Sequence, residues 1–252
     1  MSGPTYVHRF AAGTGAAGST LVLLHGSEGT DADLLPLADE LAPGAAKLAV
    51  RGSVPIGGGF AFFRRFPDRR LDEGDLAARV PVLATFIETA RKRYQLTRRP
   101  VVVGFSNGAI MAAALLMRRP GLLAGAILFR PLSPFAQEGG DRLDGTPVLI
   151  ADGADDRRRS PGDGLLVAER LSRLGARVTH RVLPVDDRCR TALGCSTRAP
   201  GARGPAIPSH GESAERDSST RCTGRDSGYV SRSQRSSSSR MSQRRSHAVG
   251  AS

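Results

Sequence analysis

The segment Val101-Val102-Val103-Gly104-Phe105-Ser106-Asn107-Gly108-Ala109-Ile110-Met111-Ala112-Ala113-Ala114 predicts a strand, a tight turn and a helix. Within it, Gly104, Ser106 and Gly108 form the pattern G-x-S-x-G. A turn this sharp lifts the serine above the sheet, and the residues two before and two after it must lack bulk so that strand and helix can approach. The segment therefore favours Ser106 as a nucleophile, against the alternative of an ordinary loop serine.

The rest of residues 1–185 alternates between short apolar runs and helix-like segments. Strands are expected at Tyr6–Ala11, Thr20–Leu24, Ala46–Val50, Pro100–Phe105, Leu122–Phe129, Pro147–Ala151 and Arg177–Leu183. Helices are expected at Asp31–Leu41, Glu73–Gln95, Asn107–Arg118 and Asp163–Leu174. This alternation predicts an α/β domain whose mostly parallel sheet is covered by helices on both faces. Reacting groups then gather beyond the carboxyl ends of the strands.

A second loop with candidate catalytic groups follows the strand at 20–24. It has the pattern H-G-x-x-G, from His25 to Gly29. In hydrolases with a G-x-S-x-G turn, this loop supplies one backbone N–H to the oxyanion and the residue after the nucleophile supplies the other. The expected donors are thus the amides of Ser27 and Asn107. His25 precedes the turn and is expected to hold the loop by hydrogen bonding, and Glu28 to be a solvated or rim carboxylate.

The strand at 147–151 runs into a loop with three carboxylates, Asp152, Asp155 and Asp156. A triad acid follows a late strand in this chain order, so the loop falls in the right place. Local chemistry does not choose among the three side chains. Any of them could instead cap the helix near Asp163 or lie in solvent, balanced by the arginines at 157–159.

Taken together, these segments resemble the phospholipase/carboxylesterase branch of the α/β-hydrolases, which is related to the dienelactone hydrolases. The resemblance covers about residues 20–185 and rests on six motifs: L-x-x-L-H-G-x-x-G at 21–29 with Asp31 and Asp33-Leu34-Leu35 after it, Arg51-Gly52, Phe60-Ala61-Phe62-Phe63-Arg64-Arg65-Phe66, G-F-S-N-G-A at 104–109, L-F-R-P at 128–131 and A-x-G-x-x-D at 151–156.

The resemblance implies an α/β-hydrolase fold and a serine esterase that acts on small-molecule carboxylic esters without a metal or an organic cofactor. It also implies that Asp156 is the triad acid, with Asp155 as the second candidate. The block at 60–66 would lie over the pocket, or else form a packed loop with its arginines outside.

The family pattern breaks where the catalytic histidine should follow the last strand. Asp187 stands at the expected position. His180 lies about seven residues too early and inside the strand, and His210 is a weak candidate in the region beyond. Loss of the base predicts a severely impaired enzyme. A shift of reading frame near position 186 would explain the abrupt break, and a genuine evolved tail is the competing explanation.

Composition changes at the same place. The chain has 252 residues and a formal net charge of +12. All nine Phe precede position 186, whereas residues 186–252 hold 12 Arg, no Lys and 15 Ser. So few apolar groups cannot offset the chain entropy lost on folding. We therefore expect a hydrolase domain at 1–185, C-terminally incomplete, and a disordered Arg/Ser-rich tail at 186–252.

The sequence also narrows the class of protein. The longest apolar run has nine residues, 109–117, too short to span a bilayer. No secretory signal is recognisable, which favours the cytoplasm, and the three cysteines lack the spacing of a zinc site. The tail has one aromatic residue and thinly spread charge, which does not favour nucleic acid as a partner. Two alternatives to an impaired esterase stay open: a catalytically silent hydrolase fold that binds a small ligand, and an RNA-associated protein using the tail. Oligomeric state is not indicated.

Overall fold

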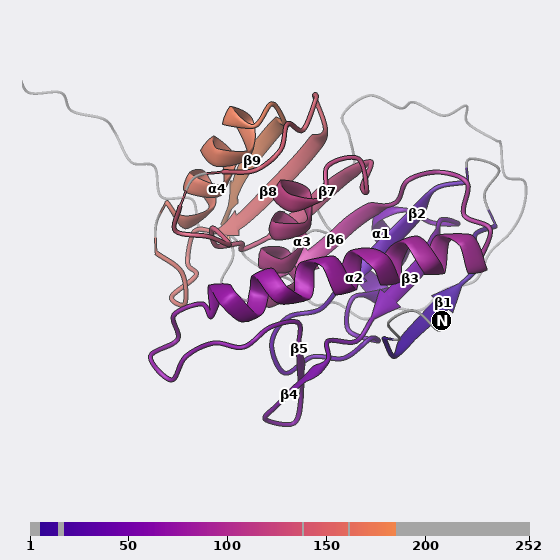
Figure 1. The fold of residues 1–252 in the computed structure, drawn as a ribbon, viewed down its shortest axis with the longest axis horizontal. Coiled ribbons are helices and arrows are strands. Elements are labelled where there is room, and N and C mark those ends of the chain that lie inside the picture. The colour runs from indigo at the N-terminus through magenta and orange to yellow at the C-terminus, as the bar shows by residue number, and fades with distance from the viewer. Residues whose placement is uncertain (1–5, 15–17, 138, 161, 185–252) are drawn as a thin grey trace, which may run out of the picture. The chain divides into compact units, whose positions relative to one another are not determined.

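The computed structural model describes residues 6–14, 18–137, 139–160 and 162–184. Seven strands form one sheet in the order β1-β3-β2-β6-β7-β8-β9 (Figure 1). Their bounds are β1 His8–Ala11, β2 Thr20–Leu24, β3 Ala46–Val50, β6 Val101–Phe105, β7 Gly125–Phe129, β8 Pro147–Gly153 and β9 Arg177–Leu183. β1 runs antiparallel to β3, and every other neighbouring pair in this sheet is parallel. The mostly parallel α/β fold expected from the sequence is confirmed.

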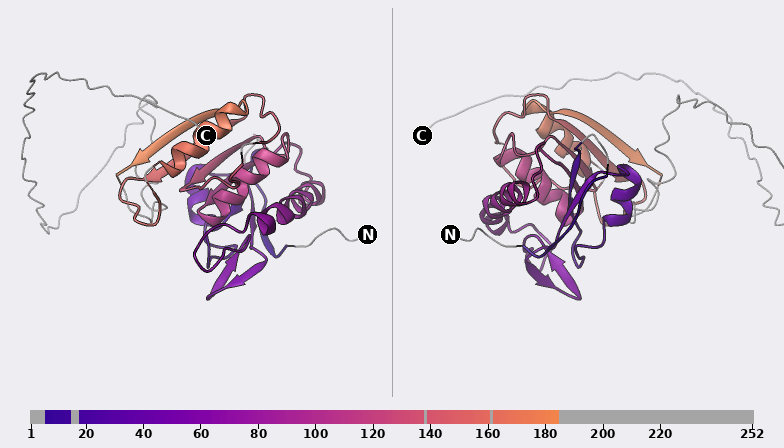
Figure 2. Two further views of the ribbon diagram at one scale, coloured as in Figure 1. Left: turned by 60° about the vertical axis from the view of Figure 1, so that its left-hand side comes forward. Right: turned by 90° about the vertical axis from the view of Figure 1, so that its right-hand side faces the viewer.

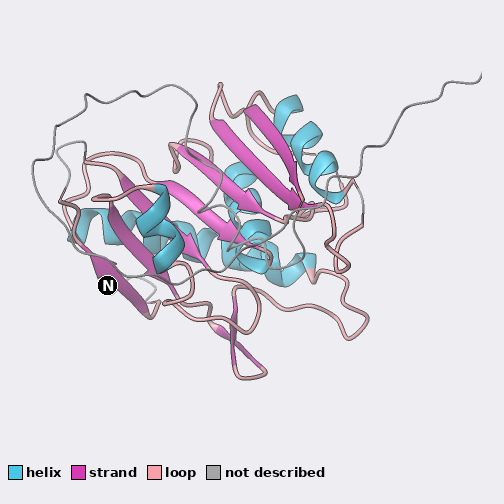
Figure 3. Ribbon diagram, turned by 180° about the vertical axis from the view of Figure 1, so that it is seen from behind, coloured by secondary structure: helices cyan, strands magenta, loops and turns pink. Residues whose placement is uncertain are grey.

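Four helices cover the two faces of this sheet (Figures 2 and 3). They are α1 Leu35–Leu41, α2 Glu73–Arg93, α3 Asn107–Arg118 and α4 Asp163–Arg173. Side chains alternate between the faces along β2: Val22 and Leu24 belong to the core shared with α2, α3 and α4, while Leu21 and Leu23 belong to the core beneath α1. β2 is buried on both faces, and its sequence after Thr20 is continuously apolar, as is typical of central parallel strands.

Local signals fix the ends of the helices. The Asp72 carboxylate accepts a hydrogen bond from the Asp75 amide and caps α2, and basic residues fill the last turn of that helix. Both features suit the helix dipole. α1 begins at Leu35 rather than at Asp31, with Pro36 in its first turn. Proline fits there because its missing N–H would have had no intrahelical acceptor.

A small hairpin, absent from the sequence prediction, lies beside the main sheet. It consists of β4 (Val54–Ile56) and β5 (Gly59–Ala61). Ile56 pairs with Gly59, and Gly57 between them has a φ of 54°, which glycine adopts without steric cost. The Phe60 amide donates to the Gly29 carbonyl at 3.1 Å. The hairpin thereby holds the loop that follows β2.

The proposed domain boundary at 185 and the basic tail at 186–252 lie outside the described residues, so both stay predictions. Within the described part, no helix combines the length and apolar character needed to cross a bilayer.

Substitutions on the two sides of α2 test which face of this helix packs against the core. Leu83 is fully buried, whereas its neighbour Val82 is 41% exposed. Leu83→Ala should lower the free energy of unfolding by about 2–5 kcal/mol through lost burial and the cavity it leaves, and Val82→Ala by less than about 0.5 kcal/mol. Urea denaturation of both variants measures this, and equal effects would contradict the assigned face.

Candidate active site

Ser106 stands at the turn between β6 and α3 in a strained conformation, with φ 51° and ψ −106°. Its amide donates to the Phe129 carbonyl on β7 at 3.0 Å, and its carbonyl accepts from Ile110 in α3. A Cβ on Gly104 would lie 2.7 Å from the Ala109 Cα. A Cβ on Gly108 would lie 2.0 Å from the Leu24 carbonyl oxygen. Only glycine therefore allows α3 to start this close to β6 and to the end of β2.

The strand order explains why the two motif loops meet. The chain places β3 on one side of β2 and later places β6 on its other side. The direction in which strands are added to the sheet therefore reverses between the neighbours β2 and β6. Crevices at such a switch point, outside the carboxyl ends of the strands, are where open α/β sheets bind ligands. The loop after β2 and Ser106 after β6 both lie there.

His25 is a structural residue of the loop after β2. It is buried, and the Gly52 amide donates to its Nε2 at 2.9 Å. Because Nε2 accepts, the ring proton is on Nδ1, which donates to the Gly26 carbonyl at 2.6 Å. Burial lowers the pKa of His25, while the Gly26 hydrogen bond and nearby carboxylates act against this. The contacts agree with the expectation that His25 holds the loop.

The Asn107 side chain joins the nucleophile turn to the aromatic block at 60–66. Its Oδ1 accepts from the Phe62 amide at 2.7 Å, and its Nδ2 donates to the Phe63 carbonyl at 3.4 Å. Phe62 and Phe63 are themselves buried in the core. Arg65 and Phe66 at the end of the block instead line a cavity beside Ser106. The block thus divides between a packed loop and a pocket wall.

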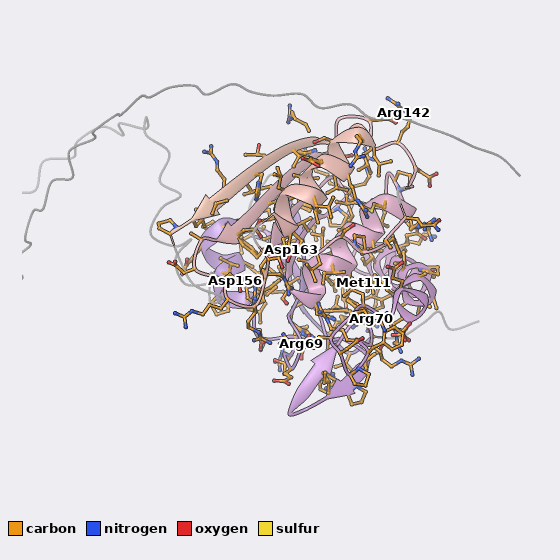
Figure 4. All side chains as sticks on the ribbon, turned by 90° about the vertical axis from the view of Figure 1, so that its left-hand side faces the viewer. Arg69, Arg70, Met111, Arg142, Asp156 and Asp163 are labelled. Atoms are coloured by element: carbon orange, nitrogen blue, oxygen red, sulfur yellow. The ribbon has the colours of Figure 1, made fainter. Side chains whose placement is uncertain are left out.

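Asp156 is held by Arg130. The Nε and Nη2 of Arg130 donate to its two carboxylate oxygens at 2.7 and 2.8 Å, and both side chains are almost fully buried. The Arg158 amide adds a third hydrogen bond at 2.9 Å. Two-pronged pairing of this kind fixes both partners in orientation. Figure 4 shows Asp156 near the start of α4, where Asp163 lies.

Arg159 occupies the space next to the serine hydroxyl. Its Nη2 donates to the Ser106 Oγ at 3.0 Å, and its Nε donates to the Arg130 carbonyl at 3.1 Å. Burial, together with repulsion from Arg130 and Arg65, lowers the pKa of Arg159 to about 10, while Asp156 and Asp163 oppose this shift. Arg159 is still protonated at neutral pH, so a cation lies within hydrogen-bond distance of the candidate nucleophile.

The other two candidate acids lie elsewhere. Asp152 Oδ2 is 2.7 Å from His180 Nε2. Burial raises the pKa of Asp152, and the hydrogen bond with His180 opposes that shift. This pair lines a separate cavity, on which Asp156 and Arg159 also border. Asp155 is exposed.

The cavity at Ser106 has a volume of about 410 Å³. Its lining residues are Gly26, Ser27, Glu28, Ile56, Arg65, Phe66, Pro67, Arg69, Phe105, Ser106, Arg130, Arg158 and Arg159. Six described residues other than glycine have a positive φ, and four of these line this one cavity: Glu28, Arg69, Ser106 and Arg130. A strained backbone persists only where the surrounding structure holds it, and such residues cluster at functional sites.

Known proteins are similar to this chain in both sequence and fold. The Bacillus subtilis (strain 168) protein named "Putative hydrolase MhqD" is 41% identical over 143 residues, 56% of this chain and 72% of the relative. The Bacillus cereus carboxylesterase superposes with a TM-score of 0.72 at 34% identity, covering 75% of this chain and 90% of that one. For the Mesorhizobium loti carboxylesterase the TM-score is 0.69 and the identity 32%, over 72% and 87%. Models of protein families give no match.

The chain belongs to the phospholipase/carboxylesterase family of α/β-hydrolases. It is therefore an esterase-type hydrolase, as the motifs around Ser106 predicted.

The structure brings together some of the predicted site residues of this carboxylesterase-like chain. Ser27 and Ser106 line one cavity. Asn107 is the first residue of α3, directly after Ser106. Asp156 does not line this cavity, but it pairs with Arg130, which does. Asp187, the expected position of the histidine, and His210 lie outside the described residues.

Sequence reasoning missed the roles of Arg130 and Arg159. Arg130 directly follows β7, so the rule that functional groups follow the carboxyl ends of strands could have identified it. No local signal distinguishes Arg159 from the arginines at 157 and 158.

Removing Arg130 should be costly because Asp156 would become a buried, uncompensated carboxylate. We expect Arg130→Leu to lower the free energy of unfolding by about 3–5 kcal/mol. Arg64→Leu is the control: Arg64 is 64% exposed, and its partner Asp75 keeps Arg79, so the loss should stay below about 1 kcal/mol. Arg130→Leu combined with Asp156→Leu should recover most of the stability. No recovery in the double variant would contradict the pairing argument.

His25 should stay neutral below its ordinary pKa. A folded-state pKa below the unfolded value of about 6.5 makes the unfolded chain bind more protons, so this contribution to stability is present above that pH and is lost as the pH falls through the folded pKa. Nitrogen-15 NMR of the imidazole at pH 6 should show a proton on Nδ1 and a free Nε2. A His25 that titrates at or above about 6.5 would overturn the assignment.

Proposed function

We propose that this chain hydrolyses carboxylic esters with Ser106 as the nucleophile. The Oγ attacks the ester carbonyl, the alcohol leaves, and water then releases the acid from the acyl-serine. The amides of Ser27 and Asn107 donate to the oxyanion, and Asp156 is the acid of the site. The carboxylesterases of Bacillus cereus and Mesorhizobium loti support the reaction type.

The observation that carries this proposal is the strained conformation of Ser106, which precedes the N-terminus of α3 and lines a cavity. The first amides of a helix have no acceptor within it, and the helix dipole favours negative charge at this end. An oxyanion beside the first turn of α3 would therefore be stabilised by groups already in place, the form of electrostatic catalysis that contributes most in acyl transfer.

The described residues place a guanidinium, and no imidazole, at the Ser106 Oγ. With a pKa of about 10, Arg159 cannot take the serine proton at neutral pH. Its positive charge instead favours the ionised form of the hydroxyl, and hydroxide or water removes the proton. Turnover is then expected near the level of a site without its base, about 10³–10⁴-fold over water.

Labelling with a fluorophosphonate probe tests the nucleophile. We expect the full chain to be labelled slowly, Ser106→Ala not at all, and Ser133→Ala as fast as the parent, because Ser133 lies outside the Ser106 cavity. Labelling that survives in Ser106→Ala would overturn the proposal.

The pH dependence of p-nitrophenyl acetate hydrolysis tests the absence of an imidazole base. We expect Ser106-dependent hydrolysis to rise continuously between pH 6 and 9, since none of the residues that the structure describes brings an imidazole to the Ser106 Oγ. A plateau with an apparent pKa of about 6.5–7.5 would contradict this and would indicate a histidine, such as His210, supplied from residues 185–252.

A further inference from the structure

We infer that the cavity at Ser106 selects esters that carry a second, negatively charged carboxylate, such as monoesters of short dicarboxylic acids. This inference rests on the proposed function of Ser106 and adds the class of substrate. It follows from the charge, the burial and the backbone strain of the cavity wall.

Five arginines line this cavity, and Glu28 is the one acidic residue among its lining. Arg130 is neutralised by Asp156. Within residues 6–14, 18–137, 139–160 and 162–184, no carboxylate lies within ion-pair distance of Arg65, Arg69 or Arg159. The described wall therefore has a surplus of positive charge next to the reacting serine.

The surplus is costly to the folded chain. Burial lowers the pKa of Arg65, and repulsion from Arg69, Arg158 and Arg130 lowers it further. For Arg159, repulsion from Arg130 and Arg65 also lowers the pKa, and Asp156 and Asp163 oppose it. Like charges gathered in a partly buried cavity lower stability, and ionisable groups perturbed by burial and by neighbouring charges cluster at functional sites.

The backbone strain of Arg69 gives an independent argument. Arg69 has a φ of 68° in a tight turn where its amide donates to the Phe66 carbonyl, and Arg65 donates to the Arg69 carbonyl at 3.0 Å. Glycine would relieve the left-handed strain of about 1–2 kcal/mol, yet the position holds an arginine that borders the cavity. Figure 4 shows Arg69 and Arg70 near the β4–β5 hairpin.

The positions of the arginines suggest how such a substrate would lie. Arg159 contacts the Ser106 Oγ, so it is next to the reacting carbonyl. Arg65 and Arg69 come from the loop at 65–71, and would receive the distal carboxylate, which fits a guanidinium through two parallel hydrogen bonds. Apolar lining from Ile56, Phe66, Pro67 and Phe105 would contact the carbon chain between them.

Binding to the full-length Ser106→Ala chain tests this without turnover. The two ligands are monomethyl glutarate and its neutral isostere, methyl 5-amino-5-oxopentanoate, compared by isothermal titration calorimetry. We expect the anion to bind at least about tenfold more tightly, a difference of about 1.4 kcal/mol. The preference should shrink between 20 and 200 mM salt, as for screened charges.

Variants assign the preference to the cavity wall. Arg65→Gln and Arg69→Gln should each weaken binding of the anion about five- to tenfold, a loss of roughly 1–1.4 kcal/mol, and leave the neutral ligand unchanged. Arg70→Gln is the matched control, because Arg70 is exposed, pairs with Asp68 and does not line the cavity. Equal affinity for the two ligands, or equal losses in Arg70→Gln, would overturn the inference.

The outcomes separate this inference from the proposed function. Selective binding of the anion, with no Ser106-dependent labelling of the parent chain, would uphold the cavity's preference and reject the nucleophile. Ser106-dependent labelling together with equal binding of both ligands would do the reverse. Anion binding that persists in Arg65→Gln and Arg69→Gln would place the site elsewhere, for example on the arginines of residues 186–252, and would reject the inference.

Discussion

The close approach of α3 to the ends of β2 and β6 is the constraint on which the site depends. A side chain on Gly108 would collide with the Leu24 carbonyl, and one on Gly104 would collide with α3 itself. This contact brings the first amides of α3 beside the loop after β2, and Ser106 at the turn has the strained combination of φ 51° and ψ −106°. The strain is maintained because the surrounding helix is almost wholly buried. A buried helix cannot tilt away to relax the turn without opening the core.

The side chains around Ser106 are distinguished by their charge. Asp156 lies in the loop expected for the acid, but its oxygens are engaged by Arg130. Even so, an ionised carboxylate has about four lone-pair acceptor sites, and the described donors use three of them, so Asp156 could still accept from an imidazole. Arg159, which donates to the Ser106 hydroxyl, occupies the place where a triad needs its base. The described residues thus place Ser106 and the first amides of α3 at the cavity, with a guanidinium rather than a proton acceptor at the Oγ.

Much of this architecture could be predicted from the sequence, because it depends on local rules. Apolar runs indicated the strands, and G-x-S-x-G located Ser106 through the steric demands of one turn. The Arg130–Asp156 pair could not be predicted, since it requires β7 and β8 to be neighbours with Phe129 opposite Ala151. Neighbouring strands in that register place the residues after them side by side. The contact between Arg159 and Ser106 depends on the path of an irregular loop, for which the sequence offers no periodicity.

The position of Arg159 also limits what a returning histidine could achieve. An imidazole can accept the serine proton only from within hydrogen-bond distance of the Oγ, where Arg159 now lies. The guanidinium would have to move, and its other hydrogen bonds, to the carbonyls of Arg130 and Arg158, would break or rearrange. A protonated imidazole beside this arginine surplus would also be disfavoured, which would lower its pKa and weaken it as a base. Efficient triad chemistry in this cavity therefore requires a substrate or a carboxylate that first offsets the positive charge.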